Sequence, residues 1–210
     1  MKRTLLLAVA IGLPAFAVAQ APAKPDLAKA RDTVNQVCAA CHGTDGTSAL
    51  PANPSLAGMP ADYITAQLAH FKSGVRQNAI MQGFASTLTD ADMVSLGAFF
   101  ASQPSKPNIA KDASLVRLGQ KLWRAGDAAT GVPACSACHG PTGAGIPKLY
   151  PRIGGQWSDY TLVQLKAFKA GERGMDKAGK DVQGRIMHGV AQGLTEEQMR
   201  ALAEYAQGLR

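Results

Sequence analysis

Two short segments carry the most distinctive chemistry of this sequence. Each follows the pattern Cys-x-x-Cys-His-Gly, at residues 38–43 and 135–140, and together they hold all 4 cysteines of the 210-residue chain. Closely spaced cysteines followed by a histidine can form a disulfide, act as a redox pair, hold zinc or attach a haem covalently. The surrounding sequence has to discriminate among these kinds of site.

Three of these interpretations fit poorly. A disulfide within Cys-x-x-Cys closes too short a loop to stabilise the fold much, because stabilisation grows with loop length. A thioredoxin-like pair expects a βαβ context and needs no following histidine. Zinc needs a fourth ligand in each copy. No other Cys or His repeats, since His70 aligns with Ala167 and His188 with Gln82.

Covalent attachment of a c-type haem uses every residue of the motif. The cysteine pair would form two thioether bonds to the porphyrin, and the adjacent histidine would bind the iron from one face. Two motifs therefore predict two haem c groups. The predicted attachment residues are Cys38, Cys41, Cys135 and Cys138, and the predicted iron-binding histidines are His42 and His139.

The motifs belong to a longer internal repeat with an offset of 97 residues. The pairs that coincide at this offset include Pro54 and Pro151, Gly58 and Gly155, Tyr63 and Tyr160, Phe71 and Phe168, and Gly74 and Gly171. The second copy gains 9 residues within 172–185, after which the offset is 106. We therefore predict a tandem duplication, with domains at 20–107 and 108–210 joined through a polar, proline-bearing linker at 102–108.

Each copy is expected to be helical, which makes the fold class all-α. The predicted helices span residues 27–37, 61–72, 114–125 and 158–169. A last helix in each copy should begin after Thr89 or Thr195, whose hydroxyl can cap it together with Asp92 or Gln198. The first helix is expected to lead almost directly into Cys38, and no stretch alternates with strand period for long.

A sixth iron ligand is predicted from the same repeat. Met93 and Met199 recur, but they lie within expected amphipathic helices, where methionine usually fills the core. Met81 and Met187 also recur, in glycine-containing segments expected to be loops, and are the predicted distal ligands. A thioether opposite a neutral imidazole raises the reduction potential. His188 is a rival ligand for the second haem, without a counterpart in the first copy.

Residues 1–19 have the pattern of a cleaved signal peptide. A basic start is followed by an apolar run that ends in the small-residue site Ala17-Val18-Ala19. The run contains Pro14 and is shorter than the roughly 20 residues that span a bilayer. The mature protein is therefore predicted to be exported to the periplasm.

Composition agrees with a globular chain that is short of large core residues. Apolar residues make up 46% and charged residues 18%, which excludes intrinsic disorder, whereas aromatic residues make up only 6%. Two porphyrins would supply the missing apolar volume. Formal charge is zero over residues 20–107 and +5 over residues 108–210, so the second domain is the basic one.

Both halves resemble class I cytochromes c, and the tandem arrangement resembles the two-haem cytochrome c4 family over essentially the whole mature chain. The resemblance implies two covalent haem c groups, held by the four motif cysteines. It also implies that Pro54 and Pro151, each 12 residues after its motif histidine, accept a hydrogen bond from the imidazole. The iron ligands that it implies are His42, Met81, His139 and Met187.

The function that this resemblance implies is electron transfer without catalysis of its own. The protein would shuttle electrons from a quinol–cytochrome c reductase to a terminal cytochrome c oxidase in the periplasm, by outer-sphere Fe(III)/Fe(II) cycling. The basic second domain would dock an acidic partner, peripheral association with the membrane is compatible with this role, and nucleic acid binding is not expected. The alternatives are an electron-transfer subunit of a periplasmic dehydrogenase or reductase complex and, less favoured, a di-haem cytochrome c peroxidase.

Overall fold

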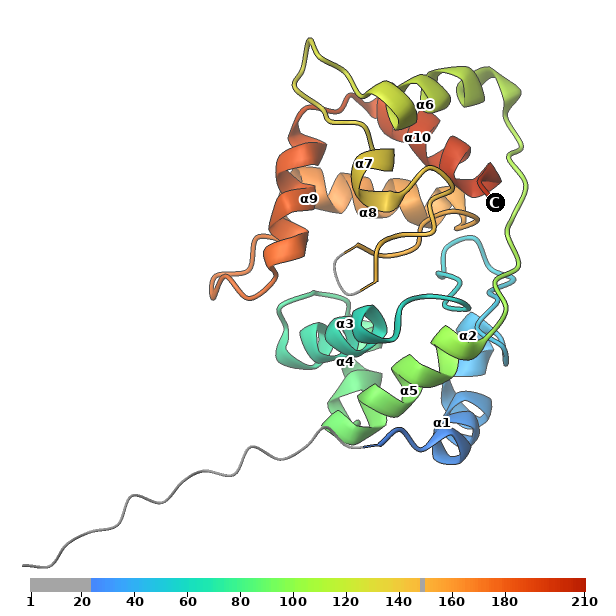
Figure 1. The fold of residues 1–210 in the computed structure, drawn as a ribbon. Coiled ribbons are helices and arrows are strands. Elements are labelled where there is room, and N and C mark those ends of the chain that lie inside the picture. Colours follow the sequence, from blue (N-terminus) through green and yellow to red (C-terminus); the bar gives the residue numbers. More distant parts are fainter. Residues whose placement is uncertain (1–23, 148–149) are drawn as a thin grey trace, which may run out of the picture.

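The computed structural model describes residues 24–147 and 150–210, which form two helical halves joined by an extended segment (Figure 1). The predicted signal peptide lies outside the described residues. Residues 103–112 connect the halves without a helix, and the domain boundary between 107 and 108 stays a prediction. Within the described ranges no residue belongs to a strand, and the β pairing is limited to two isolated bridges.

The first half contains the helices of residues 27–102. These are α1 (Leu27–Thr33), the π-helical turn η1 (Val34–Cys38), α2 (Ala39–His42), α3 (Ala61–Ser73), α4 (Ala79–Ser86) and α5 (Asp90–Ser102). The first helix does lead directly into the motif, because η1 continues α1 as far as Cys38. The expected helix over 61–72 is confirmed as α3.

The second half repeats this order after the linker. Its helices are α6 (Ala113–Ala125), α7 (Ser136–His139), α8 (Ser158–Ala170), α9 (Val182–Gln192) and α10 (Glu196–Gly208). The expected helices over 114–125 and 158–169 are confirmed as α6 and α8. No helix of the described part of the chain is both long and apolar enough to cross a bilayer.

The last helix of each half begins at the predicted cap. Thr89 accepts a hydrogen bond from the Asp92 amide, and the Asp92 carboxylate accepts one from Thr89. Thr195 and Gln198 form the same reciprocal capping box at the start of α10. Because the first turn of each helix is satisfied in this way, α5 and α10 start at equivalent points of the repeat.

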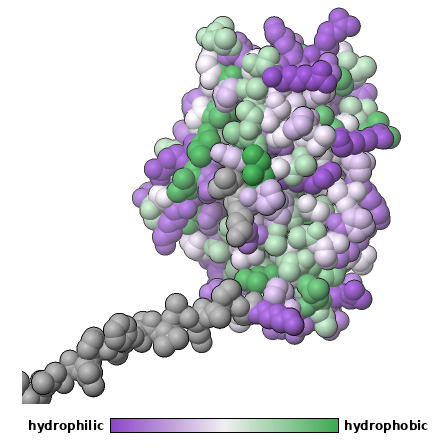
Figure 2. All heavy atoms as spheres, in the orientation of Figure 1, coloured by the Kyte–Doolittle hydropathy of each residue, from purple (hydrophilic) through white to green (hydrophobic). Residues whose placement is uncertain are grey.

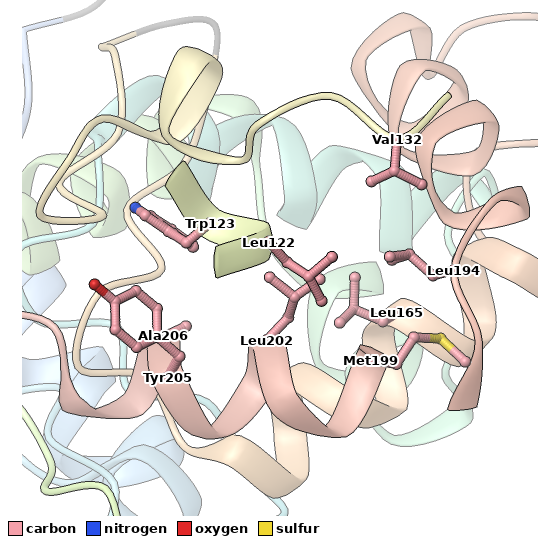
Figure 3. Close-up of a cluster of buried hydrophobic side chains, with 9 residues drawn as sticks. All are labelled: Leu122, Trp123, Val132, Leu165, Leu194, Met199, Leu202, Tyr205 and Ala206. Carbon is pink, nitrogen blue, oxygen red and sulfur yellow. The ribbon is translucent and has the colours of Figure 1, made fainter. Parts of the chain in front are cut away.

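Two separate hydrophobic cores form, one in each half. In the second half, side chains of α6 and α10 meet those of α8 and of the loops beside them, as Figure 3 shows. Met93 and Met199, predicted to be core residues, are 1% and 3% exposed. The helices pack around these cores, and the histidines of the two motifs line a common cavity.

Met81 and Met187 do not lie in loops, as the sequence had suggested. Met81 belongs to α4 and Met187 to α9, and both helices contain glycines. Glycine lowers helix propensity by about 1 kcal/mol relative to alanine, which hid the helical pattern. Asn78 and Asp181 cap the two helices by accepting backbone hydrogen bonds. Packing of α4 against α3 and of α9 against α8 stabilises them further.

Candidate functional site

A continuous cavity of about 810 Å³ lies between the two halves and is walled by side chains of both. The predicted ligands of both halves line it. They are Cys38, Cys41, His42, Met81, His139 and Met187. Cys135 and Cys138 are not part of this wall, but they precede His139 within the same turn, and the His139 amide donates to the Cys135 carbonyl over 2.9 Å.

Both motif histidines are buried and held in one orientation. His42 Nδ1 lies 2.9 Å from the Pro54 carbonyl oxygen, and His139 Nδ1 lies 3.0 Å from that of Pro151. These are the hydrogen bonds that the resemblance implied. With Nδ1 donating to a carbonyl, Nε2 is the ring nitrogen left with a free lone pair, which suits an axial ligand.

Burial also keeps these rings neutral. Desolvation lowers the pKa of His42 and of His139, and the hydrogen bonds to Pro54 and Pro151 offset only part of that effect. A neutral imidazole is the form that binds a metal ion. Both the orientation and the protonation state of the two histidines therefore suit binding of a metal ion.

No disulfide joins the four cysteines of the two motifs. Burial raises the pKa of Cys38, and it raises the pKa of Cys135 to about 11. A zinc site would need three or four converging side chains of this kind. No group of three or more His, Cys, Asp or Glu side chains converges anywhere in the described ranges. The donor set therefore fits a covalently attached haem.

His188, the rival ligand, lies away from the cavity wall. Its Nδ1 is 2.6 Å from the Phe168 carbonyl oxygen, and its Nε2 is 3.4 Å from Gln192. The neighbouring Met187 lines the cavity and His188 does not. Of the two adjacent residues, only the methionine has access to a cofactor in the cavity.

Large apolar side chains surround the methionine-bearing helices at the surface. Ile80 and Phe84 on α4 are 69% and 47% exposed, and Val182 and Ile186 on α9 are 56% and 46% exposed. Figure 2 shows hydrophobic residues gathered over the edge of the molecule where α9 lies. Ile80 and Phe84 line the cavity itself, where a porphyrin would contact them, whereas Val182 and Ile186 are not part of its wall. The apolar side chains on α9 are thus of the kind that forms the centre of a protein–protein contact.

The halves are joined across the cavity by a reciprocal polar network that sequence analysis missed. Arg76 donates to Gln67 of its own half over 2.8 Å, and to Tyr160 and Gln164 of the other half over 2.9 Å each. Arg173 makes the equivalent hydrogen bonds from the second half. It donates to Gln164 of its own half over 2.6 Å, and to Tyr63 and Gln67 of the first half over 2.9 Å and 3.1 Å. We call these six residues the arginine bridge.

Both arginines of the bridge are buried, each 8% exposed, and each guanidinium lies over a phenylalanine of its own half. Burial would raise the pKa of the Tyr160 hydroxyl, but the charges of Arg76 and Arg173 outweigh it and lower the pKa. The signal for the bridge was present in the sequence. Its members coincide at the same offset of 97 residues as the haem motifs.

Comparisons with known proteins agree with this geometry. A family model described as cytochrome c matches residues 116–210, and one described as cytochrome c oxidase, cbb3-type, subunit III matches residues 25–100. A cytochrome c4 of Thiocapsa roseopersicina is 40% identical over 193 residues, covering 91% of this chain and 96% of that protein.

Two further relatives matter for function. The crystal structure of reduced recombinant cytochrome c4 from Pseudomonas stutzeri has a TM-score of 0.80 and 36% identity, and the match covers 89% of this chain and 100% of that one. A thiosulfate dehydrogenase electron acceptor of Thiomonas intermedia (strain K12) is 37% identical over 171 residues, covering 80% of this chain and 76% of that protein.

The repeated motifs, the oriented histidines and these relatives lead to one conclusion. The chain consists of two cytochrome c domains with all-α folds, and it carries two covalent haem c groups. The resemblance inferred from the sequence is confirmed: this protein belongs to the cytochrome c4 family of di-haem electron-transfer proteins.

Proposed function

We propose that this protein is a periplasmic electron carrier with one histidine–methionine-ligated haem in each domain. His42 and Met81 bind the first iron, and His139 and Met187 bind the second. The residues that attach the porphyrins are Cys38, Cys41, Cys135 and Cys138. The observation that carries this assignment is the shared cavity, whose wall contains both histidines and both repeated methionines.

Residues of this chain orient the iron-binding histidines, and the repeated methionines disfavour catalysis at the iron. The carbonyls of Pro54 and Pro151 fix the imidazole rings, and the hydrogen bonds make those rings more basic ligands. A haem bound between imidazole and thioether supplies one-electron Fe(III)/Fe(II) cycling at a raised reduction potential, and it leaves no coordination position for a substrate. Catalysis by a peroxidase would need such a position, so the repeated methionine argues against it.

The arginine bridge makes the two domains one electron-transfer unit. Its hydrogen bonds run in both directions between α3 and α8 and their following loops. A second contact adds to it, since the Gln156 side chain accepts from the Ser55 amide and donates to the Ser55 carbonyl, both over 2.9 Å. Two haems held in one rigid unit let a single molecule carry two electrons.

For partners, we propose a quinol–cytochrome c reductase as donor and a terminal oxidase as acceptor. The exposed apolar side chains on α9 offer a contact surface outside the cavity wall, and the charge of +5 over residues 108–210 favours an acidic partner there. A second candidate is an electron acceptor of a periplasmic dehydrogenase, which the similarity to the thiosulfate dehydrogenase electron acceptor favours.

Ligation is tested by potentiometric titration of the purified holoprotein followed in the visible spectrum. Two one-electron waves are expected, and the ferrous protein should not bind carbon monoxide. Met81→His should lower one wave and Met187→His the other, because bis-histidine ligation lacks the methionine that raises the potential. Met93→Leu, a core methionine, serves as the control and should move neither wave. Rapid carbon monoxide binding by the native protein would contradict the assignment.

The partners are tested by mixing the reduced or oxidised holoprotein with each candidate enzyme in a stopped-flow instrument. Electron transfer from a quinol–cytochrome c reductase that slows with rising salt supports the first route. Transfer only from thiosulfate dehydrogenase with thiosulfate supports the second. The haem ligation proposed above does not depend on which route is found.

A further inference from the structure

The methionine-bearing helices of the two domains start from different caps. The Asn78 side chain accepts a hydrogen bond from the Met81 amide over 2.9 Å at the start of α4, and Asp181 accepts one from the Gly184 amide over 2.8 Å at the start of α9. Both residues line the cavity. The cap is therefore neutral in the first domain and a carboxylate in the second.

The two caps also differ in burial. Asp181 is 3% exposed, whereas Asn78 is exposed. A buried charge is screened far less by water and salt than a surface charge, so its field reaches further within the protein. Exposed Lys177 and Lys180 lie on the same segment, but solvent screens them. Asp181 is thus a buried negative charge in the cavity wall, beside the buried guanidinium groups of Arg76 and Arg173, which also line it.

The surroundings of Asp181 do not repeat in the first domain. Arg173 is one neighbour, and it has the counterpart Arg76, so that positive charge is common to both domains. The other neighbour is His70 of the first domain, whose Nδ1 lies 4.0 Å from the Asp181 carboxylate. Residues 63–89 of the first domain contain no acidic residue at all. Asp62 and Glu172 also line the cavity but are exposed, and half-buried Arg152 adds a positive charge on the side of the second domain. Among the described side chains of the cavity wall, Asp181 is thus a buried carboxylate that has no counterpart on the methionine-bearing helix of the first domain.

We propose that the buried carboxylate of Asp181 lowers the reduction potential of the second haem and so offsets the basic charge of the second domain. A nearby negative charge favours the ferric over the ferrous state, because the ferric haem carries one more positive charge. Positive charge spread over residues 108–210 acts in the opposite direction. Asp181 is then a residue that sets the potential of one haem without binding it.

This inference rests on the proposed ligation, and the test keeps the two apart. The spectrum of each variant first shows whether both haems still have histidine–methionine ligation. The charge-transfer absorption of the iron–methionine bond in the ferric protein is the readout. Its absence in the native protein would overturn the proposed function, whereas altered potentials with intact ligation concern Asp181 alone.

The central variant is Asp181→Asn, titrated potentiometrically at about pH 8, where an ordinary imidazole is neutral. Asparagine already caps α4 in this chain, so the variant should keep α9 capped and the thermal midpoint close to that of the native protein. The second-domain wave, identified with Met187→His, is expected to move to higher potential. The ferrous-to-ferric ratio at fixed solution potential should rise about threefold to tenfold, where tenfold is about 59 mV.

Two further variants make the test symmetrical. Asn78→Asp places the same carboxylate at the first cap and should lower the first-domain wave, by less than Asp181→Asn raises the second, because residue 78 is exposed. Glu172→Gln removes an exposed carboxylate from the same segment and serves as the matched control, with a smaller shift expected. The proposal is overturned if Asp181→Asn leaves the second wave in place, moves both waves equally, or shifts it no more than Glu172→Gln does.

Discussion

The two domains match closely where they face each other and differ where each holds its methionine. Across the interface, the arginine bridge uses residues that coincide at a single offset of 97, with nearly equal distances in both directions. Beside the methionines, α4 has 8 residues after a neutral cap and α9 has 11 after a carboxylate, preceded by the inserted segment. The interface keeps the symmetry of the repeat, and the difference between the domains lies in what surrounds the distal ligands.

The packing of the first and last helices gives the largest expected contrast between the domains. In the second domain, Gly119 of α6 lies so close to α10 that an added Cβ would collide with the Ala201 carbonyl oxygen. In the first domain α1 already has a buried alanine, Ala30, within the core cluster shared with α5. The second domain therefore depends on a glycine at this crossing and the first does not.

Gly119→Ala should lower the free energy of unfolding by about 3 kcal/mol, because backbone atoms of α10 cannot move aside cheaply. Denaturant titration followed by far-UV circular dichroism measures this loss. Gly189→Ala is the control in the same domain, since nothing lies within 4 Å of its added Cβ and alanine favours the helix. A loss at Gly119 no larger than at Gly189 would contradict the close crossing.

The arginine bridge allows a direct test of symmetry. Arg76→Gln and Arg173→Gln should each cost about 2 kcal/mol, because each removes buried hydrogen bonds from a charged donor. The two losses should be similar in thermal or denaturant unfolding, with Arg173→Gln somewhat the larger because it also leaves the buried Asp181 carboxylate without this cationic neighbour. Arg200→Gln, which changes an exposed arginine of α10, should have little effect.

The double variant of the bridge should cost more than the sum of the single ones. Gln67 and Gln164 each accept from both arginines, so they keep one guanidinium donor in either single variant and lose both in the double variant. The double-mutant cycle isolates this coupling. Strictly additive losses, or one arginine that matters far more than the other, would show that the geometric symmetry has no energetic counterpart.

The two domains should also differ, by a smaller amount, in how much stability they lose in acid, because the caps of their last helices, α5 and α10, differ in whether they titrate. The hydrogen bond from Lys29, together with those from Thr89, lowers the pKa of Asp92 from 3.8 to about 2, whereas Gln198 at the equivalent position of α10 does not titrate. Because the folded-state pKa is depressed, the stabilisation is complete above about pH 4 and is lost as the pH falls through about 2. The effect is on the order of 1 kcal/mol, the usual size of a capping interaction.

Unfolding measured between pH 5 and pH 2 in the native protein and in Asp92→Asn checks this expectation. The acid loss of the native protein should shrink in Asp92→Asn, since asparagine caps without titrating. Gln198→Glu, the reciprocal change, should introduce a new acid loss in the second domain. An acid loss that Asp92→Asn leaves unchanged would place the sensitive group elsewhere.

The sequence predicted the parts of the fold that depend on local chemistry. The capping boxes at Thr89 and Thr195 and the entry of the first helix into Cys38 each involve residues close together in the sequence. Such pairs form through short-range backbone geometry, which the spacing of the residues already contains. The hydrogen bonds from His42 and His139 to prolines 12 positions away were expected only from the resemblance to class I cytochromes c.

The features that sequence analysis missed depend on tertiary contacts. The arginine bridge joins residues 84 to 110 positions apart, and nothing in local sequence indicates that Arg173 meets Tyr63. The helical state of Met81 and Met187 was hidden by glycines, whose low propensity is overridden by caps and by packing on α3 and α8. The proposed effect of Asp181 on the reduction potential of the second haem, opposite to that of the basic surface, likewise could not be predicted, because the sequence does not show that Asp181 is buried.

The most direct test of histidine–methionine ligation at both haems is the proton NMR spectrum of the fully reduced holoprotein. A methionine bound to a low-spin ferrous haem lies against the porphyrin, whose ring current shifts its methyl resonance far upfield. Two such methyl resonances are expected per chain, one lost in Met81→Ala and the other in Met187→Ala. A single resonance, none, or two that survive either substitution would contradict the histidine–methionine ligation of the two haems.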